Sequence, residues 1–119
     1  MQTTIAVLDA NEAVRRALGR VLQKRDFIVR TFSRTKQFLD YLNSTAVDIA
    51  VVDCDLLEIG LLPGRNGQTG QVRPRLVLTT ASPTRQQTLR ETYPGLPVLL
   101  KPFGSKELLT FILKDNEVP

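Results

Sequence analysis

Histidine and tryptophan are absent from this sequence of 119 residues, and cysteine occurs once, at Cys54. A single cysteine cannot form a disulfide within the chain, and the lack of histidine argues against metal sites built from nitrogen and sulfur ligands. No apolar run approaches the roughly 20 residues that cross a bilayer, and the first residues lack the basic and then apolar pattern of a signal peptide. We therefore expect a cytoplasmic protein with no membrane-spanning segment.

The sequence is only moderately basic. Sixteen basic and 12 acidic residues give a formal net charge of +4. The basic residues are spread along the chain, and no helix-turn-helix or aromatic-basic motif accompanies them, so we interpret them as a solvated surface. The hydrophobic content of 42% is typical of a globular protein, and the length fits one domain over residues 1–119.

Five short apolar runs alternate with stretches of helical periodicity. The runs are Ile5–Leu8, Phe27–Phe32, Ile49–Val52, Leu76–Leu78 and Val98–Leu100. Most are continuously apolar, as expected of parallel strands that are covered on both faces. The helical stretches begin near Asn11, Ser33, Ser82 and Ser105. This alternation predicts the α/β class, with a doubly wound sheet of five parallel strands.

One helix of this alternation is degraded or missing. The segment Gly60–Gly70, which follows the third apolar run, contains four glycines and a proline. Glycine adds backbone entropy and proline removes a hydrogen-bond donor, so both disfavour a helix. We expect a loop or at most one turn. An ordinary loop is the simpler interpretation, and a partner-binding segment is the alternative.

Polar side chains follow four of the predicted strands. They are Asp9, Asp53, Thr80 and Lys101. Each alone could be a turn former or a helix cap, but four such groups, each directly after its own strand, are hard to explain by capping. Because sites in open α/β sheets form at the carboxyl ends of the strands, we expect these four side chains to converge.

Four segments carry a resemblance to a known family. They are Val7–Asn11 (VLDAN), Ile49–Asp53 (IAVVD), Leu78–Ala81 (LTTA) and Leu100–Phe103 (LKPF). In this order and spacing they resemble the receiver domains of two-component response regulators, over nearly the whole chain. The stretches 14–18 and 32–39 look most similar to the nitrogen-fixation-regulator (FixJ-like) branch. The resemblance implies a flavodoxin-like fold and a signalling switch, and not an enzyme with a substrate of its own.

The resemblance also assigns roles to single residues. Asp53 would accept a phosphoryl group from phosphohistidine on a sensor histidine kinase. Lys101 would pair with the phosphoryl oxygens, Thr80 would swing to bond them, and the backbone amide of Ala81 would complete the cradle. The peptide bond between Lys101 and Pro102 would be cis, as is typical of this family.

Magnesium is the cofactor that the resemblance implies, held by Asp9, Asp53 and the backbone carbonyl of Asp55. The family normally has a second acid beside the first, where this sequence has Ala10. Since magnesium is commonly held by one or two carboxylates plus waters, we expect a weakened site rather than none. A further departure is Val98, where many family members have an aromatic partner for the switching threonine.

Two hypotheses remain open at this point. In the first, phosphorylation changes the surface of the family's fourth helix, fifth strand and fifth helix, here Pro83–Leu113, and favours a homodimer or a partner complex. In the second, the chain is an atypical pseudo-receiver that binds a protein partner without phosphorylation. Transcription regulation, and any contact with nucleic acid, would need an output domain beyond residues 1–119.

The expected core consists of apolar residues of the strands and helices. They are Ile5, Val7, Leu18, Leu22, Ile49, Val51, Val52, Leu76, Leu78, Leu99 and Phe111. Leu108 and Leu109 could serve either the core or a dimer face. Cys54 fits best as a small buried hydrophobic residue.

Overall fold

The computed structural model describes residues 2–62 and 74–116. Its strands are β1 (Thr4–Leu8), β2 (Ile28–Phe32), β3 (Ile49–Asp53), β4 (Arg75–Thr80) and β5 (Val98–Leu100). Its helices are α1 (Glu12–Gln23), α2 (Thr35–Ser44), α3 (Pro83–Thr92) and α4 (Ser105–Asn116), with a short 3-10 helix η1 (Ile59–Leu61). The strands form one parallel sheet in the order β2-β1-β3-β4-β5. This is the flavodoxin-like order, and it confirms the predicted fold class.

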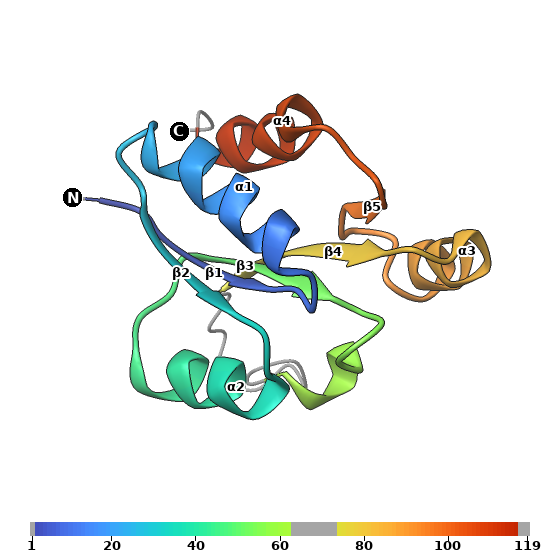
Figure 1. The fold of residues 1–119 in the computed structure, drawn as a ribbon. Helices are drawn as coiled ribbons and strands as arrows, with labels where there is room; N and C mark the ends of the chain where they lie inside the picture. Colours follow the sequence, from blue (N-terminus) through green and yellow to red (C-terminus); the bar gives the residue numbers. More distant parts are fainter. Residues whose placement is uncertain (1, 63–73, 117–119) are drawn as a thin grey trace.

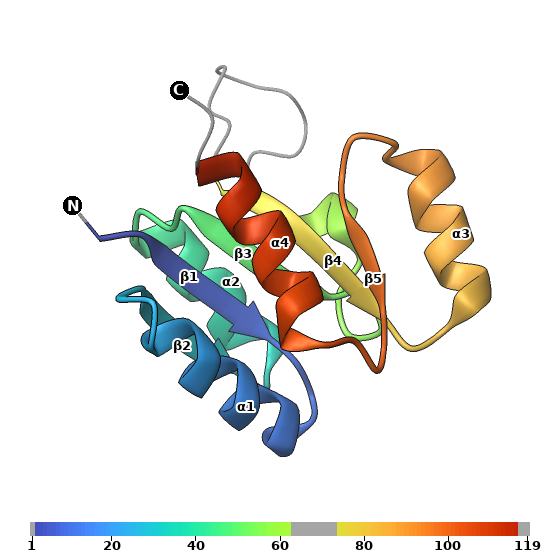
Figure 2. The same cartoon turned by 90° about the horizontal axis from the view of Figure 1, so that it is seen from above.

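Helices cover both faces of the sheet (Figure 1). Helices α1 and α4 lie on one face, and α2 and η1 lie on the other. Helix α3 lies beside β5 at the edge of the sheet (Figure 2). None of its ten residues is fully buried, but Leu89 packs against the core on the α2 side. Among the helices of residues 2–62 and 74–116, none is long and apolar enough to cross a membrane.

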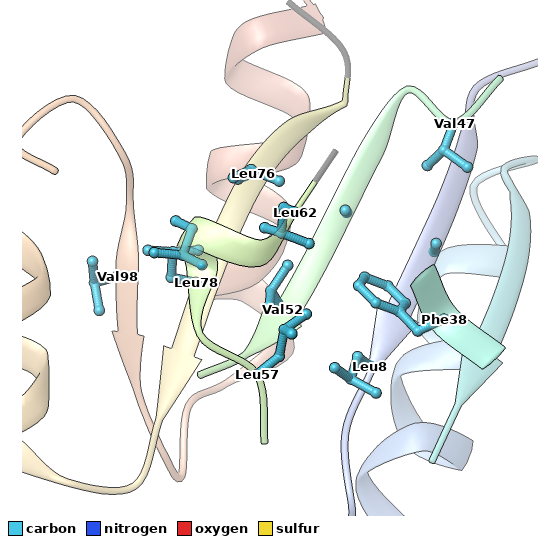
Figure 3. Packing of buried hydrophobic residues seen from close by; sticks show 12 residues of the cluster. Leu8, Phe38, Val47, Val52, Leu57, Leu62, Leu76, Leu78 and Val98 are labelled. Carbon is cyan, nitrogen blue, oxygen red and sulfur yellow. The ribbon is translucent and has the colours of Figure 1, made fainter. Parts of the chain in front are cut away.

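Because both faces are covered, alternate residues of the inner strands β1, β3 and β4 enter two different cores. In β1, Ile5 and Val7 pack under α1 and α4, and Ala6 and Leu8 pack on the α2 side. The ring of Phe38, from α2, is fully buried in this second core (Figure 3).

The predicted core is confirmed except at Phe111. That side chain is only partly buried, and the next residue, Ile112, is fully buried instead. In α4, Leu108 is fully buried and Leu109 only partly, so the core takes Leu108. The buried side of α4 is therefore shifted by about one residue relative to the prediction.

Between β3 and β4 the described residues form only the single turn η1, as expected of a missing helix. Three apolar side chains of this short segment, Leu57, Ile59 and Leu62, are nevertheless buried against the sheet. They cover part of the face that a helix would otherwise protect. Residues 63–70 of the Gly60–Gly70 segment lie outside the described residues.

Side-chain caps begin two of the helices, at residues near which the sequence predicts helix starts. Asn11 accepts the amide of Val14 at 3.1 Å at the start of α1, and Ser82 accepts the amide of Arg85 at 3.0 Å at the start of α3. The helical stretch expected to begin near Ser33 is α2, and Ser33 does not cap it. Helix α2 begins one residue later, after Arg34, without a side-chain cap.

Candidate functional site

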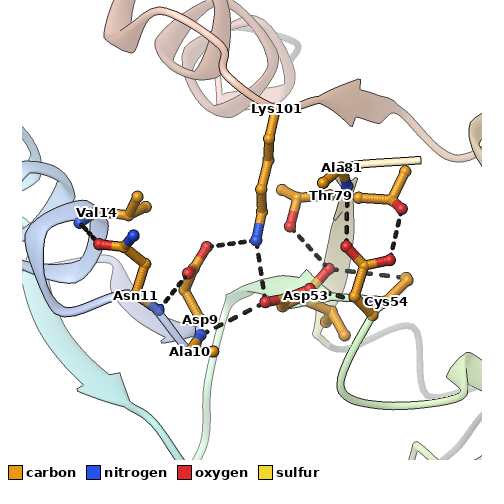
Figure 4. A network of polar contacts seen from close by, with 12 residues as sticks. Asp9, Ala10, Asn11, Val14, Asp53, Cys54, Thr79, Ala81 and Lys101 are labelled. Carbon is orange, nitrogen blue, oxygen red and sulfur yellow. Dashed lines mark hydrogen bonds and ion pairs between the residues drawn. The ribbon is translucent and has the colours of Figure 1, made fainter. Parts of the chain in front are cut away.

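Three charged side chains meet at the carboxyl edge of the sheet. Asp9 follows β1, Asp53 ends β3, and Lys101 follows β5. The ammonium nitrogen of Lys101 lies 2.9 Å from Oδ2 of Asp9 and 3.0 Å from Oδ2 of Asp53 (Figure 4). Strands β1 and β3 are neighbours at the point where the strand order reverses, which is where ligands bind in such sheets. The expected convergence of these three side chains is therefore present.

Both carboxylates are buried, at 3% exposure for Asp9 and 2% for Asp53. Backbone amides compensate part of this burial. Asn11 donates to Oδ1 of Asp9 at 2.8 Å, Asp55 donates to Oδ1 of Asp53 at 3.0 Å, and Ala10 donates to Oδ2 of Asp53 at 3.4 Å. Since buried carboxylates are costly unless they are paired and hydrogen-bonded, this edge depends on Lys101 for its charge balance.

The environment of Lys101 stabilises its charged form. Burial by itself acts to lower the pKa of Lys101, but hydrogen bonds to Asp9 and Asp53 and the attraction of these carboxylates outweigh burial and raise the pKa. Lys101 is therefore a fixed positive charge beside the predicted acceptor. The peptide bond that follows it, to Pro102, is cis as expected.

Thr80 and Ala81 meet a different carboxylate, that of Asp55. The hydroxyl of Thr80 donates to Oδ1 of Asp55 at 2.7 Å, and the amide of Ala81 donates to Oδ2 at 2.9 Å. Arg85, in the first turn of α3, forms an ion pair with the same carboxylate. Neither the Asp55 side chain nor Arg85 is among the residues that the sequence predicts for the site. Their positions in the sequence could have identified them, because Asp55 follows β3 by two residues and Arg85 lies in the first turn of α3, both near the same edge of the sheet.

The contacts of Asp55 favour its ionised form. Burial acts to raise the pKa of Asp55, but hydrogen bonds from Ala81, Thr80 and Arg85 outweigh burial and lower the pKa. The neighbouring thiol of Cys54 responds in the opposite direction. Burial and the negative charges of Asp53 and Asp55 raise its pKa to about 11, so Cys54 is a weak nucleophile.

A pocket of about 720 Å³ opens beside these groups. Asp9, Asp53 and Lys101 line its polar part. The rest is mostly apolar and comes from one side of α1 and from the segment after β5, namely Val14, Ala17, Leu18, Val21, Pro102 and Phe103. Asp53, although buried, therefore faces a hollow and is not sealed beneath packed side chains.

The donor set suits a hard cation, but only two carboxylates supply it. The Oδ2 atoms of Asp9 and Asp53 both lie within 3.0 Å of one positive group, the ammonium of Lys101. The side chain of Ala10 adds no oxygen, and residues 2–62 and 74–116 contain no group of three acidic, His or Cys side chains placed to hold a metal. Two carboxylates and waters fit a weak magnesium site that shares its ligands with Lys101. The role of the Asp55 carbonyl oxygen stays a prediction.

Comparison with known proteins finds similarity in structure but not in sequence. No family model and no curated protein matches the sequence. The solution structure of a response regulator protein from Burkholderia multivorans has a TM-score of 0.77 at 18% identity and covers 100% of this chain and 98% of that one. The BeF3-activated receiver domain of DrrB, from Thermotoga maritima, has a TM-score of 0.73 at 22% identity, with coverage of 99% and 100%.

A third solved structure is a response regulator protein from Burkholderia pseudomallei that contains a phosphorylated aspartic acid, a calcium ion and citrate. Its TM-score is 0.69 at 17% identity, with coverage of 98% of this chain and 74% of that one. These similarities show that the chain has the receiver-domain fold over nearly its whole length. Membership of the FixJ-like branch stays a prediction.

Proposed function

We propose that this chain is a receiver domain in which Asp53 accepts a phosphoryl group from the phosphohistidine of a sensor histidine kinase. The observation that carries the proposal is the contact between Lys101 and Asp53, at 3.0 Å, beside an open pocket. Two of the similar structures support it, since one contains a phosphorylated aspartic acid and the other is BeF3-activated.

In the proposed transfer, a carboxylate oxygen of Asp53 attacks the phosphorus and forms a new phosphorus–oxygen bond. The phosphorus–nitrogen bond breaks, its electron pair stays on the imidazole nitrogen, and that nitrogen takes up a proton from solvent. Lys101 already touches the accepting carboxylate, so its ammonium can pair with the phosphoryl oxygens as they arrive. The chain thus acts as a switch and not as an enzyme with a substrate of its own.

Asp9 and Asp53 are the residues that would hold magnesium. The ion, when bound, supplies positive charge against the phosphoryl oxygens. This chain has Ala10 in place of a further acid, so we propose that Lys101 carries a larger share of the charge balance than in a receiver with three acids.

The kinase would reach Asp53 along the pocket. Its apolar side is formed by α1 residues such as Val14 and Val21 and by Phe103 after β5. A protein surface can cover these groups while it presents its phosphohistidine at the polar part. The responding surface would be Pro83–Leu113, the region that we propose for partner binding or homodimer formation.

Phosphorylation with a small phosphodonor tests the proposal directly. Acetyl phosphate with magnesium should add the mass of one phosphoryl group to the wild type, and Asp53→Asn should abolish the addition. Asp40→Asn is a matched control, because Asp40 is an exposed acid of α2 far from the site in sequence. If the wild type and Asp53→Asn behave identically, the proposal is lost. The atypical pseudo-receiver, an interaction module that works without phosphorylation, then replaces it.

A further inference from the structure

The donors that the resemblance assigns to a phosphoryl group are engaged by a side chain of the protein itself. The Thr80 hydroxyl and the Ala81 amide both point to the carboxylate of Asp55, at 2.7 and 2.9 Å. Arg85 adds a charged donor to the same carboxylate. One anion thus receives three donors, two neutral and one charged, and bonds to an ionised acceptor are among the stronger protein hydrogen bonds.

A tight turn after β3 holds this carboxylate in place. The backbone carbonyl of Asp53 accepts the amides of Leu56 at 3.0 Å and Leu57 at 3.2 Å. The amide of Asp55 donates to the Asp53 side chain at 3.0 Å. Leu57 is buried at 2% exposure and anchors the turn in the core. The turn therefore fixes the backbone position of Asp55, and three donors hold its partly exposed side chain.

The same contacts extend to the start of α3. The Thr80 side chain is fully buried, and its oxygen also accepts the amide of Ser82, the N-cap of α3, at 3.1 Å. Arg85 lies in the first turn of that helix and pairs with Asp55. Since α3 has no fully buried residue, these polar contacts help to tie its N-terminus to the sheet.

We propose that Asp55 is a built-in anion that occupies the Thr80 and Ala81 donors and competes for them with a phosphoryl group on Asp53. Without phosphorylation, the Asp55 carboxylate keeps the Thr80 hydroxyl hydrogen-bonded to itself. It also keeps the start of α3 against the sheet edge. A phosphoryl group on Asp53 can recruit these donors only when the Asp55 carboxylate leaves them. This inference rests on the proposed function, because it names the side chain that regulates the same site.

The experiment is a titration with beryllium fluoride in the presence of magnesium, followed by the amide resonance of Ala81. If the binding site is free for only about a tenth of the time, its apparent affinity for the ligand is about tenfold weaker. We therefore expect Asp55→Ala to tighten the apparent beryllium fluoride affinity about tenfold, and Asp55→Asn to tighten it less. Glu58→Ala is the matched control, because it removes an exposed acid from the same segment.

The outcomes separate this inference from the proposed function. Tighter binding by Asp55→Ala but not by Glu58→Ala supports the competition, and binding that appears only in Asp55→Ala supports it most strongly. Adding Asp53→Asn to Asp55→Ala should abolish the gain. Equal affinity of wild type and Asp55→Ala overturns the inference while the proposed function stands. If neither protein binds beryllium fluoride, both fail. Thermal unfolding of each variant checks that the fold is retained.

Discussion

Lys101 and Asp53 are 48 residues apart in the chain, yet Nζ of Lys101 lies 3.0 Å from Oδ2 of Asp53. The sheet brings them together, because both residues lie where parallel strands end at a common edge. Lys101 contacts Asp9 as well, so one ammonium balances two buried carboxylates. The site is thus an ion triad in which the cation is the shared member.

Replacing Lys101 should therefore destabilise the fold. Lys101→Met keeps the length of the side chain but leaves two buried carboxylates without their cation, so we expect a loss of about 3 kcal/mol in the free energy of unfolding. Urea denaturation near neutral pH with a chelator measures it. Lys106→Met replaces an exposed lysine of α4 and should change stability by less than about 0.5 kcal/mol. Equal stability of the two variants would contradict the charge balance described for this edge.

Adjacent leucines of α4 offer a second test, because they differ in burial. Leu108 is fully buried and Leu109 only partly. Leu108→Ala should lower the free energy of unfolding by about 3 kcal/mol, and Leu109→Ala by about half of that. If Leu109 also serves a dimer face, Leu109→Ala should reduce dimer formation in light scattering without a matching loss of monomer stability. Equal losses in both variants would show that α4 is rotated from the orientation described above.

The strands could be predicted from the sequence, but the rotation of the last helix could not. Continuous apolar runs such as Ile49–Val52 leave few alternatives to buried parallel strands, since both faces must be covered. In α4, however, apolar residues occur at 108, 109, 111, 112 and 113 and surround much of the helix. A pattern this wide does not fix which side faces the sheet, and that is why Phe111 was placed in the core instead of Ile112.

The charged site could likewise be predicted only in part from the sequence. Asp9, Asp53 and Lys101 could be predicted to converge because strand ends fix their positions. The contact of Asp55 with Thr80 could not, since it depends on the turn after β3 and on the direction of one side chain. Turn conformation and side-chain rotamers are set by tertiary contacts that a linear pattern of residues does not record.

The thiol of Cys54 should be slow to react. Burial and the neighbouring carboxylates raise its pKa from 9.0 to about 11. The reactive thiolate therefore forms only as the pH approaches that value, and the thiol dominates below it. At about pH 8, iodoacetamide should modify the folded protein roughly a hundredfold more slowly than the unfolded protein in guanidinium, with a chelator in both samples. Mass spectrometry follows the reaction, and a rate that stops rising below about pH 9 would contradict the raised pKa.

Ala10 is the position where a third acid can be restored. It is exposed, it lines the pocket, and its amide already donates to Asp53. Ala10→Asp should strengthen magnesium binding about tenfold, or about 1.4 kcal/mol, because carboxylate charge governs the affinity for a hard divalent cation. The variant should also be less stable than the wild type without magnesium and regain stability when it is added, since the ion then balances the extra charge. Calorimetric titration measures the affinity, and Ala10→Asn separates charge from size. If Ala10→Asn gains as much affinity as Ala10→Asp, or neither gains any, the ion does not bind beside Asp9 and Asp53.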